Sequence, residues 1–195
     1  MKDLDFQNLK NNSEYISVED FFERFDKYYK NAKSDFKKLE TLQYYHEDSS
    51  SPMWVYFKGD VKSFINSLEK FKQDELGDVS TGNLSEKRIH FIDYPISKYL
   101  EYEYYTYVVS STLGQDIKIL PTPKNQNLSD FVIFDDAKLL IHDYDEGGKL
   151  VGAYDFLGSD EQIAKLSQVY NQLYKSSLDF ESMFEPDKNI ISKFQ

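Results

Sequence analysis

The chain has 195 residues, a formal net charge of −11 at pH 7, and 40% hydrophobic residues. This length and apolar content suit one domain with a buried core, which excludes a wholly disordered chain. The sequence contains no cysteine, which excludes disulfide frameworks, thiolate zinc sites and thiol catalysis. The negative charge disfavours direct binding of nucleic acid, because such binding depends on neutralising phosphates.

No apolar run is long enough to span a membrane, and the first residues lack the pattern of a signal peptide. We therefore expect a cytoplasmic protein that does not contact a membrane. Residues 1–16 are polar, which predicts an N-terminal arm that is loose or lies across the surface. A single α/β domain is expected over residues 17–185, followed by a C-terminal tail over residues 186–195.

The first part of the chain is predicted to alternate helices and strands. Ser17 suits a helix cap, and apolar residues at helical spacing follow it. The elements expected are, in order, a helix over 18–32, a strand over 36–45, a helix over 60–76 and a polar loop over 77–86. Residues 53–57 suit a strand by propensity, or a short helix opened by Ser51 and Pro52.

The second part is predicted to end in an antiparallel meander. In order, we expect a strand over 88–93, a helix over 96–113, strands over 116–120, 131–134, 138–144 and 150–156, and a helix capped by Ser159. Residues 99–105 alternate Tyr and Glu, so they also suit a strand. The order predicts a mixed central sheet of about five to six strands that is flanked by helices.

Several short motifs occur along the chain in a definite order. They are Leu39-Glu40-Thr41, Gly114-Gln115-Asp116-Ile117 and the run from Asp130 and Phe131 to Phe134, Asp135 and Asp136, together with Pro95, Tyr99, Glu103 and Gly148. In these motifs, over about residues 17–180, the chain resembles an uncharacterised bacterial family of domains of unknown function that is common in actinobacteria. The resemblance implies a fold but no established activity, and family members often accompany helix-turn-helix regulators.

The strand order is also similar to one half of a phospholipase D-like fold. The His-x-Lys catalytic signature of that superfamily is absent, because Ile92 and Tyr144 stand two residues after His90 and His142. If the fold is related, that chemistry is therefore expected to be missing.

Four residues are candidates for catalysis or metal binding. Asp135 and Asp136 lie between two predicted strands and could bind a divalent metal or divide acid and base roles, although Asp is also common in tight turns. His142 and Asp143 belong to a dense run of possible ligands, but on a strand they point to opposite faces. Ordinary turns are favoured at both places, and no metal or cofactor is expected.

A second group of residues suggests ligand binding. Glu40 and Glu103 stand in apolar surroundings, where a carboxylate is either an acid–base group or the ion-pair partner of a residue such as Arg88. Tyr99 and Tyr105 belong to a tyrosine-rich segment that either packs on the sheet or lines a cleft for a flat or cationic ligand. Glu40, Glu103, Tyr99 and Tyr105 are therefore the candidate ligand-binding residues.

The sequence favours a non-catalytic regulatory or interaction module that acts through protein contacts or a small ligand. Its expected partner is a protein such as a helix-turn-helix regulator. One alternative is a metal-dependent hydrolase or nuclease-like enzyme, which requires Asp135, Asp136, His142 and Asp143 to converge. Another is an acidic antitoxin, immunity protein or phage-encoded inhibitor, which requires a flat carboxylate-rich face without a pocket.

Overall fold

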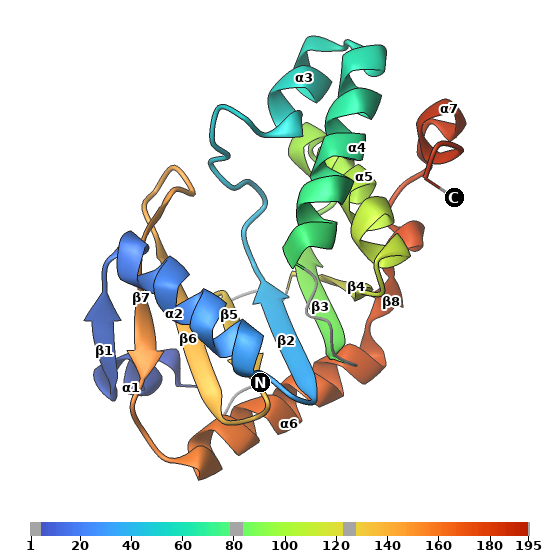
Figure 1. Cartoon of the computed structure of the whole chain (residues 1–195). Coiled ribbons are helices and arrows are strands. Elements are labelled where there is room, and N and C mark those ends of the chain that lie inside the picture. Colours follow the sequence, from blue (N-terminus) through green and yellow to red (C-terminus); the bar gives the residue numbers. More distant parts are fainter. Residues whose placement is uncertain (1–4, 79–83, 123–127, 195) are drawn as a thin grey trace.

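The computed structural model describes residues 5–78, 84–122 and 128–194 (Figure 1). The helices in these ranges are α1 (Phe6–Asn11), α2 (Val18–Asn31), α3 (Pro52–Lys58), α4 (Val61–Asp78), α5 (Lys98–Thr112), α6 (Asp160–Ser176), the 3-10 helix η1 (Phe180–Ser182) and α7 (Lys188–Ile191). The strands are β1 (Ser13–Ile16), β2 (Asp35–Glu40), β3 (Ser85–Ile92), β4 (Asp116–Pro121), β5 (Phe131–Phe134), β6 (Lys138–Tyr144), β7 (Leu150–Phe156) and β8 (Leu178–Asp179). None of the described helices combines the length and the apolar character needed to cross a membrane.

The strands form one mixed sheet, as predicted, in the order β1-β7-β6-β5-β2-β3-β4-β8. The central pairs β2–β3 and β3–β4 are parallel, whereas β5, β6 and β7 form the predicted antiparallel meander. Parallel neighbours need crossover connections, and α3 with α4 and then α5 supply them. The sheet has eight strands rather than five or six among the described residues, because the short strands β1 and β8 extend its two edges.

Helices cover both faces of the sheet. On one face, α2 packs over β5, β6 and β7 through Phe21, while α5 packs over β3 and β4 through residues such as Val109. On the opposite face, α6 packs Leu166 and Tyr170 against Leu39 of β2 and residues of the neighbouring strands. Figure 1 shows α2 in front of one half of the sheet and α4 with α5 over the other half.

The described residues of the expected N-terminal arm and C-terminal tail pack against the rest of the domain. Residues 5–16 form α1 and β1, and β1 pairs with β7 along the sheet edge. Phe6 and Leu9 are buried in the core under α6. At the other end, Ile190 and Phe194 pack against the cluster around α5. Both segments are too short for a periodic signal, and partners distant in the sequence stabilise them.

The uncertain segment at residues 53–57 belongs to helix α3. The hydroxyl of Ser51 accepts a hydrogen bond from the backbone N–H of Met53 at 3.2 Å, and Pro52 occupies the first turn. The preceding strand ends at Glu40 rather than at residue 45, because the next backbone N–H, that of Thr41, donates to the Asp130 carboxylate at 2.8 Å instead of to the sheet. Of the expected polar loop over 77–86, residues 79–83 lie outside the described part of the chain.

Candidate functional site

A cleft of about 700 Å³ opens over the middle of the sheet, between α2 and α4. Its sides are formed by Val18 and Phe22 of α2 and by Phe71 and Glu75 of α4. The remaining lining residues are Lys38, Glu40, Arg88, Tyr45, His46, Glu47, Asp48, Tyr99, Tyr102, Glu103, Thr106, Tyr144, Gly148, Lys149 and Leu150. Charged and tyrosine side chains therefore dominate the walls of this cleft.

The floor of the cleft is charged because no helix covers the sheet there. Successive side chains of a strand point to opposite faces, so Leu39 enters the core under α6 while Lys38 and Glu40 face the cleft. The parallel register of β2 and β3 places Lys38 beside Arg88 and Glu40 beside His90. Two neighbouring strands thus bring four titratable side chains onto one face.

Glu40 is the centre of an ion-pair group on this floor. Its side chain is 5% exposed, and its Oε1 lies 2.7 Å from Nζ of Lys38, while its Oε2 lies 3.6 Å from Nε of Arg88. Burial alone would raise the pKa of Glu40, but the charges of Arg88 and Lys38 outweigh it and hold the pKa well below its usual value. Within the described part of the chain, Oε2 and the Arg88 Nε make no hydrogen bond. The floor therefore keeps unused hydrogen-bonding capacity.

A polar network beside the floor, where α5 covers the sheet, positions Arg88. The buried His90 donates from Nε2 to the carbonyl oxygen of Leu42 at 2.7 Å and accepts at Nδ1 from the Tyr107 hydroxyl at 2.5 Å. This tautomer follows because a carbonyl oxygen can only accept. Burial lowers the pKa of His90, which keeps the ring neutral. The guanidinium of Arg88 lies 5.5 Å from the centre of the Tyr107 ring, which holds the cation in place.

Two further carboxylates share one tyrosine at the α5 end of the cleft. The Tyr99 hydroxyl lies 2.8 Å from Oε1 of Glu47 and 3.2 Å from Oε1 of Glu103. Burial, followed by the negative charges of Glu40 and Glu47, raises the pKa of Glu103 to about 7. Burial also raises the pKa of Glu47. The Ser51 side chain also bonds Glu47 and the Tyr107 side chain also bonds Glu103, so all the donors of this pair are neutral side chains.

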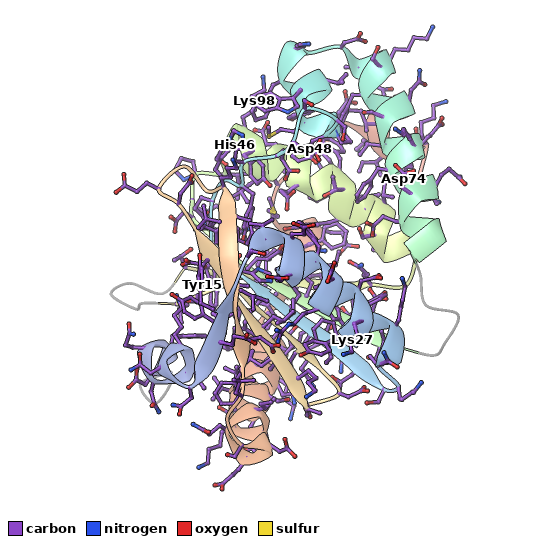
Figure 2. All side chains as sticks on the ribbon, turned by 60° about the vertical axis from the view of Figure 1, so that its left-hand side comes forward. Tyr15, Lys27, His46, Asp48, Asp74 and Lys98 are labelled. Atoms are coloured by element: carbon purple, nitrogen blue, oxygen red, sulfur yellow. The ribbon has the colours of Figure 1, made fainter. Side chains whose placement is uncertain are left out.

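The segment between β2 and α3 forms this end of the cleft, and two contacts fix it. The Asp130 carboxylate accepts from the Thr41 hydroxyl at 2.6 Å and from the Tyr45 hydroxyl at 2.5 Å. Gly148 has a φ of 76°, and a Cβ there would stand 2.5 Å from the backbone oxygen of Tyr44, so only glycine permits this close approach. Figure 2 shows His46 and Asp48 of the segment near Lys98, at the start of α5.

Three of the four predicted ligand-binding residues meet in this cleft. Glu40, Tyr99 and Glu103 all line it. Tyr105 does not line it. Tyr105 follows Glu103 by two positions on α5, and side chains at that spacing point to nearly opposite sides of a helix. There its ring packs against Phe64 at a centroid distance of 5.6 Å, and its hydroxyl accepts from a backbone N–H of the C-terminal segment.

Asp135 and Asp136 form the turn between β5 and β6. Their φ angles are 52° and 54°, the positive values that tight hairpin turns require. The Asp135 carboxylate accepts from the backbone N–H groups of Lys33, Ser34 and Asp35. Partial burial opposes ionisation, but these bonds and that of the Ser34 hydroxyl lower the pKa of Asp135 to about 2. The carboxylate is therefore an anchor for the loop before β2.

His142 and Asp143 lie at the other end of β6 and face opposite sides of the sheet. His142 is buried, with its ring 5.0 Å from that of Phe21, and burial lowers its pKa to about 3. Its Nδ1 bonds the Tyr144 hydroxyl at 3.0 Å. The structure thus does not bring the four predicted catalytic residues together. In residues 5–78, 84–122 and 128–194, no group of three or more His, Asp and Glu is placed to hold a metal ion.

Several lining residues were not singled out from the sequence. Lys38 carried a usable signal, because it lies two residues before Glu40 in a predicted strand and therefore shares one face of the sheet with it. The sequence indicates Arg88 only as an ion-pair partner of a carboxylate. Tyr45 and Tyr144 lie outside the tyrosine-rich segment that contains Tyr99 and Tyr102, and only the folded chain brings them to the same wall.

Comparison with known proteins adds a family and distant solved structures. An archaeal chromatin protein, TrmBL2, is 6% identical with a TM-score of 0.44, over 84% of this chain and 52% of its own. NucT from Helicobacter pylori is 12% identical with a TM-score of 0.47, over 86% and 98% of the two chains. A phosphatidylserine synthase from Haemophilus influenzae Rd KW20 is 14% identical with a TM-score of 0.42, over 85% and 39%. This chain therefore spans about half the length of the chromatin protein.

No function is inferred from these three likenesses, and no curated protein sequence matches the chain. A sequence family does match. Because the pattern of the domain of unknown function DUF6879 covers residues 23–185, most of the chain, the protein belongs to that family.

Proposed function

We propose that this domain is a non-catalytic regulatory module that binds a small polar ligand in the cleft between α2 and α4. The observation that carries the proposal is the charged floor of an open cavity, where Glu40 is nearly buried between Lys38 and Arg88. Burying such an ion group is costly, and well-packed apolar side chains would be at least as stable. The charges therefore fit recognition of a polar ligand better than a purely structural role.

The non-catalytic part of the proposal follows from the positions of the candidate catalytic groups. Asp135 is occupied with three backbone N–H groups at one end of the β5–β6 hairpin, and His142 is buried beside Phe21 at the other. A flat inhibitor face is also less suited to this chain, because a tyrosine-lined cleft interrupts the surface. A protein partner, such as a helix-turn-helix regulator that responds to the ligand, remains a prediction.

The proposal is tested by blocking the cleft. Val18 lines the cleft from α2, so Val18→Trp places an indole in it, whereas Val151→Trp adds the same ring at a position of β7 that is 41% exposed. The tagged chains are captured from extract of the native cell, and small molecules released by denaturation are measured by mass spectrometry. We expect a retained small molecule in the wild type and in Val151→Trp, and its loss in Val18→Trp.

The opposite result is equally informative. If the wild type carries no small molecule, while one protein partner is captured in equal amounts by all three chains, direct protein contact replaces ligand binding as the function. Retention of the same small molecule by Val18→Trp would also contradict the proposed location.

A further inference from the structure

We infer that the ligand of this cleft is an organic cation, a primary amine or quaternary ammonium compound, held by Glu47 and Glu103 beside a row of tyrosine rings. This inference rests on the proposed function and names the chemical class that the cleft recognises. It depends on the distribution of charge, on the aromatic wall and on the cavity that contains both.

The charge of the cleft is unbalanced toward the negative side. Among the described lining residues, five side chains are carboxylic acids and three are Lys or Arg. Glu40 already binds Lys38 and lies close to Arg88. Within the described residues, no salt bridge reaches Glu47 or Glu103. Arg88 acts on Glu103 and Lys38 acts on Glu47 only from beyond salt-bridge distance, so an added cation could contact both carboxyl groups directly.

The geometry of the carboxylate pair leaves room for a donor. Glu47 and Glu103 lie on either side of the Tyr99 hydroxyl, at 2.8 and 3.2 Å. The neutral donors there are the hydroxyls of Tyr99, Ser51 and Tyr107, whereas a primary ammonium group supplies up to three hydrogens and any organic ammonium also neutralises charge. The raised pKa of Glu103 has the same origin, because burial and the neighbouring carboxylates make a second negative charge costly there.

Tyrosine rings form a continuous row along the same wall. The ring centres of Tyr144 and Tyr45 are 5.5 Å apart, those of Tyr45 and Tyr99 6.1 Å, and those of Tyr99 and Tyr102 5.7 Å. All four residues line the cleft. Electron-rich rings beside carboxylates are the surroundings in which proteins bind organic ammonium groups. A bare metal ion fits less well, because within the described chain no three acidic or His groups are placed to ligate one.

The test compares ligands that share a hydroxyphenylethyl skeleton and differ in the charge of the terminal group. Tyramine is a cation, 4-propylphenol replaces its ammonium with a methyl group, and 3-(4-hydroxyphenyl)propionate is an anion. Choline and spermidine extend the cations. Titration calorimetry on the full chain at pH 7 should show at least one cation binding about tenfold more tightly than both the neutral and the anionic compound.

Variants locate the preference. Glu47→Gln and Glu103→Gln should each lower affinity for the bound cation about tenfold and leave any binding of 4-propylphenol unchanged. Gln matches the shape of protonated Glu, and circular dichroism verifies that each variant is folded. Glu161→Gln on α6 removes the same charge from an exposed side chain outside the cleft and should have no effect.

Three outcomes would overturn the inference. The first is that the neutral or the anionic compound binds as tightly as every cation. This result would contradict the preference for cations but not the proposed function, ligand binding in the cleft. The second is equal weakening by all three variants, which assigns the preference to the net charge of −11 rather than to the pair. The third is no cation binding in the wild type; the proposed function then stands or falls on the separate experiment with Val18→Trp.

Discussion

At the scale of single residues, the centre of this protein is a set of charges that would be costly if unpaired. Glu40 is ionised because Lys38 and Arg88 lie beside it, and Arg88 is further held over the Tyr107 ring. At Glu103 on α5, burial and the negative charges of Glu40 and Glu47 outweigh the charge of Arg88, so the pKa of Glu103 is raised instead. Two carboxylates in one cleft therefore have opposite shifts, and each can be tested on its own.

Removing the charge of Glu40 is expected to destabilise the fold. In Glu40→Gln, Lys38 and Arg88 keep their charges, with side chains only 24% and 18% exposed, and lose their counter-ion. We expect a loss of about 2 kcal/mol in the free energy of unfolding, measured with urea at pH 7. Glu161→Gln, which breaks an exposed ion pair on α6, is the control and should change little. A loss no greater than the control's would contradict the ion-pair role of Glu40.

Glu103 is expected to make stability depend on pH. Its folded-state pKa of about 7 lies above the usual 4.5, so the folded state favours the protonated form. The contribution of Glu103 to stability is therefore fully present at a pH below its usual pKa of 4.5. It is lost as the pH rises through the folded-state pKa of about 7. Relative to Glu103→Gln, the wild type should therefore lose stability between about pH 5 and pH 8, by an amount on the order of 3 kcal/mol.

Urea unfolding of both chains across that range measures the difference directly. Contributions from other groups cancel where they are common to the two chains. A difference that stays constant with pH would show that Glu103 ionises at its ordinary pKa in the folded protein.

At the scale of elements, the sequence pattern of a helix is ambiguous where the helix is buried on several sides. Helix α5 is buried along most of its length, since it lies between the sheet, α3, α4 and the C-terminal segment. Its tyrosines and glutamates therefore do not form one apolar stripe, and residues 99–105 read equally well as a strand. Helix α2 has one exposed face, and its apolar spacing predicted its bounds to within one residue.

The short N-terminal helix α1 gives a test at this scale. Phe6 is 4% exposed and its ring lies 5.9 Å from that of Phe131, so Phe6→Ala should cost about 3 kcal/mol of unfolding free energy. Gln7→Ala, at an exposed position of the same helix, should change stability by less than about 0.5 kcal/mol. Equal small effects for the two variants in urea denaturation would support a loose arm instead of a packed one.

At the scale of the whole molecule, helices pack on both faces of one sheet but leave the middle of β2 and β3 uncovered on one face. The helices α2 and α4 stand on either side of this uncovered part, and the cleft lies between them. The protein as a whole has a net charge of −11, and the cleft shares that excess of carboxylates. Repulsion between these charges is spread over the surface and is sensitive to salt.

Salt is accordingly expected to stabilise the fold. Raising NaCl from about 0.02 to about 0.3 M screens long-range repulsion among the carboxylates, so the urea midpoint at pH 7 should rise. Potassium chloride at the same ionic strength is the control for a specific effect of sodium. A fall in the midpoint would show that ion pairs such as those of Arg24 with Glu14 and Asp155 outweigh the repulsion.

The sequence by itself determined the local elements and part of the site. Apolar spacing and turn residues predicted β5, β6 and β7, and carboxylates or tyrosines in apolar segments indicated Glu40, Tyr99 and Glu103, because these signals lie within a few neighbouring residues. Only the tertiary structure decided that residues 13–16 add a strand to the sheet, that Tyr105 faces away from the cleft and that Arg88 reaches Glu40. Strand pairing and the meeting of α2, α4 and α5 around the cleft depend on contacts between distant segments, which local patterns do not encode.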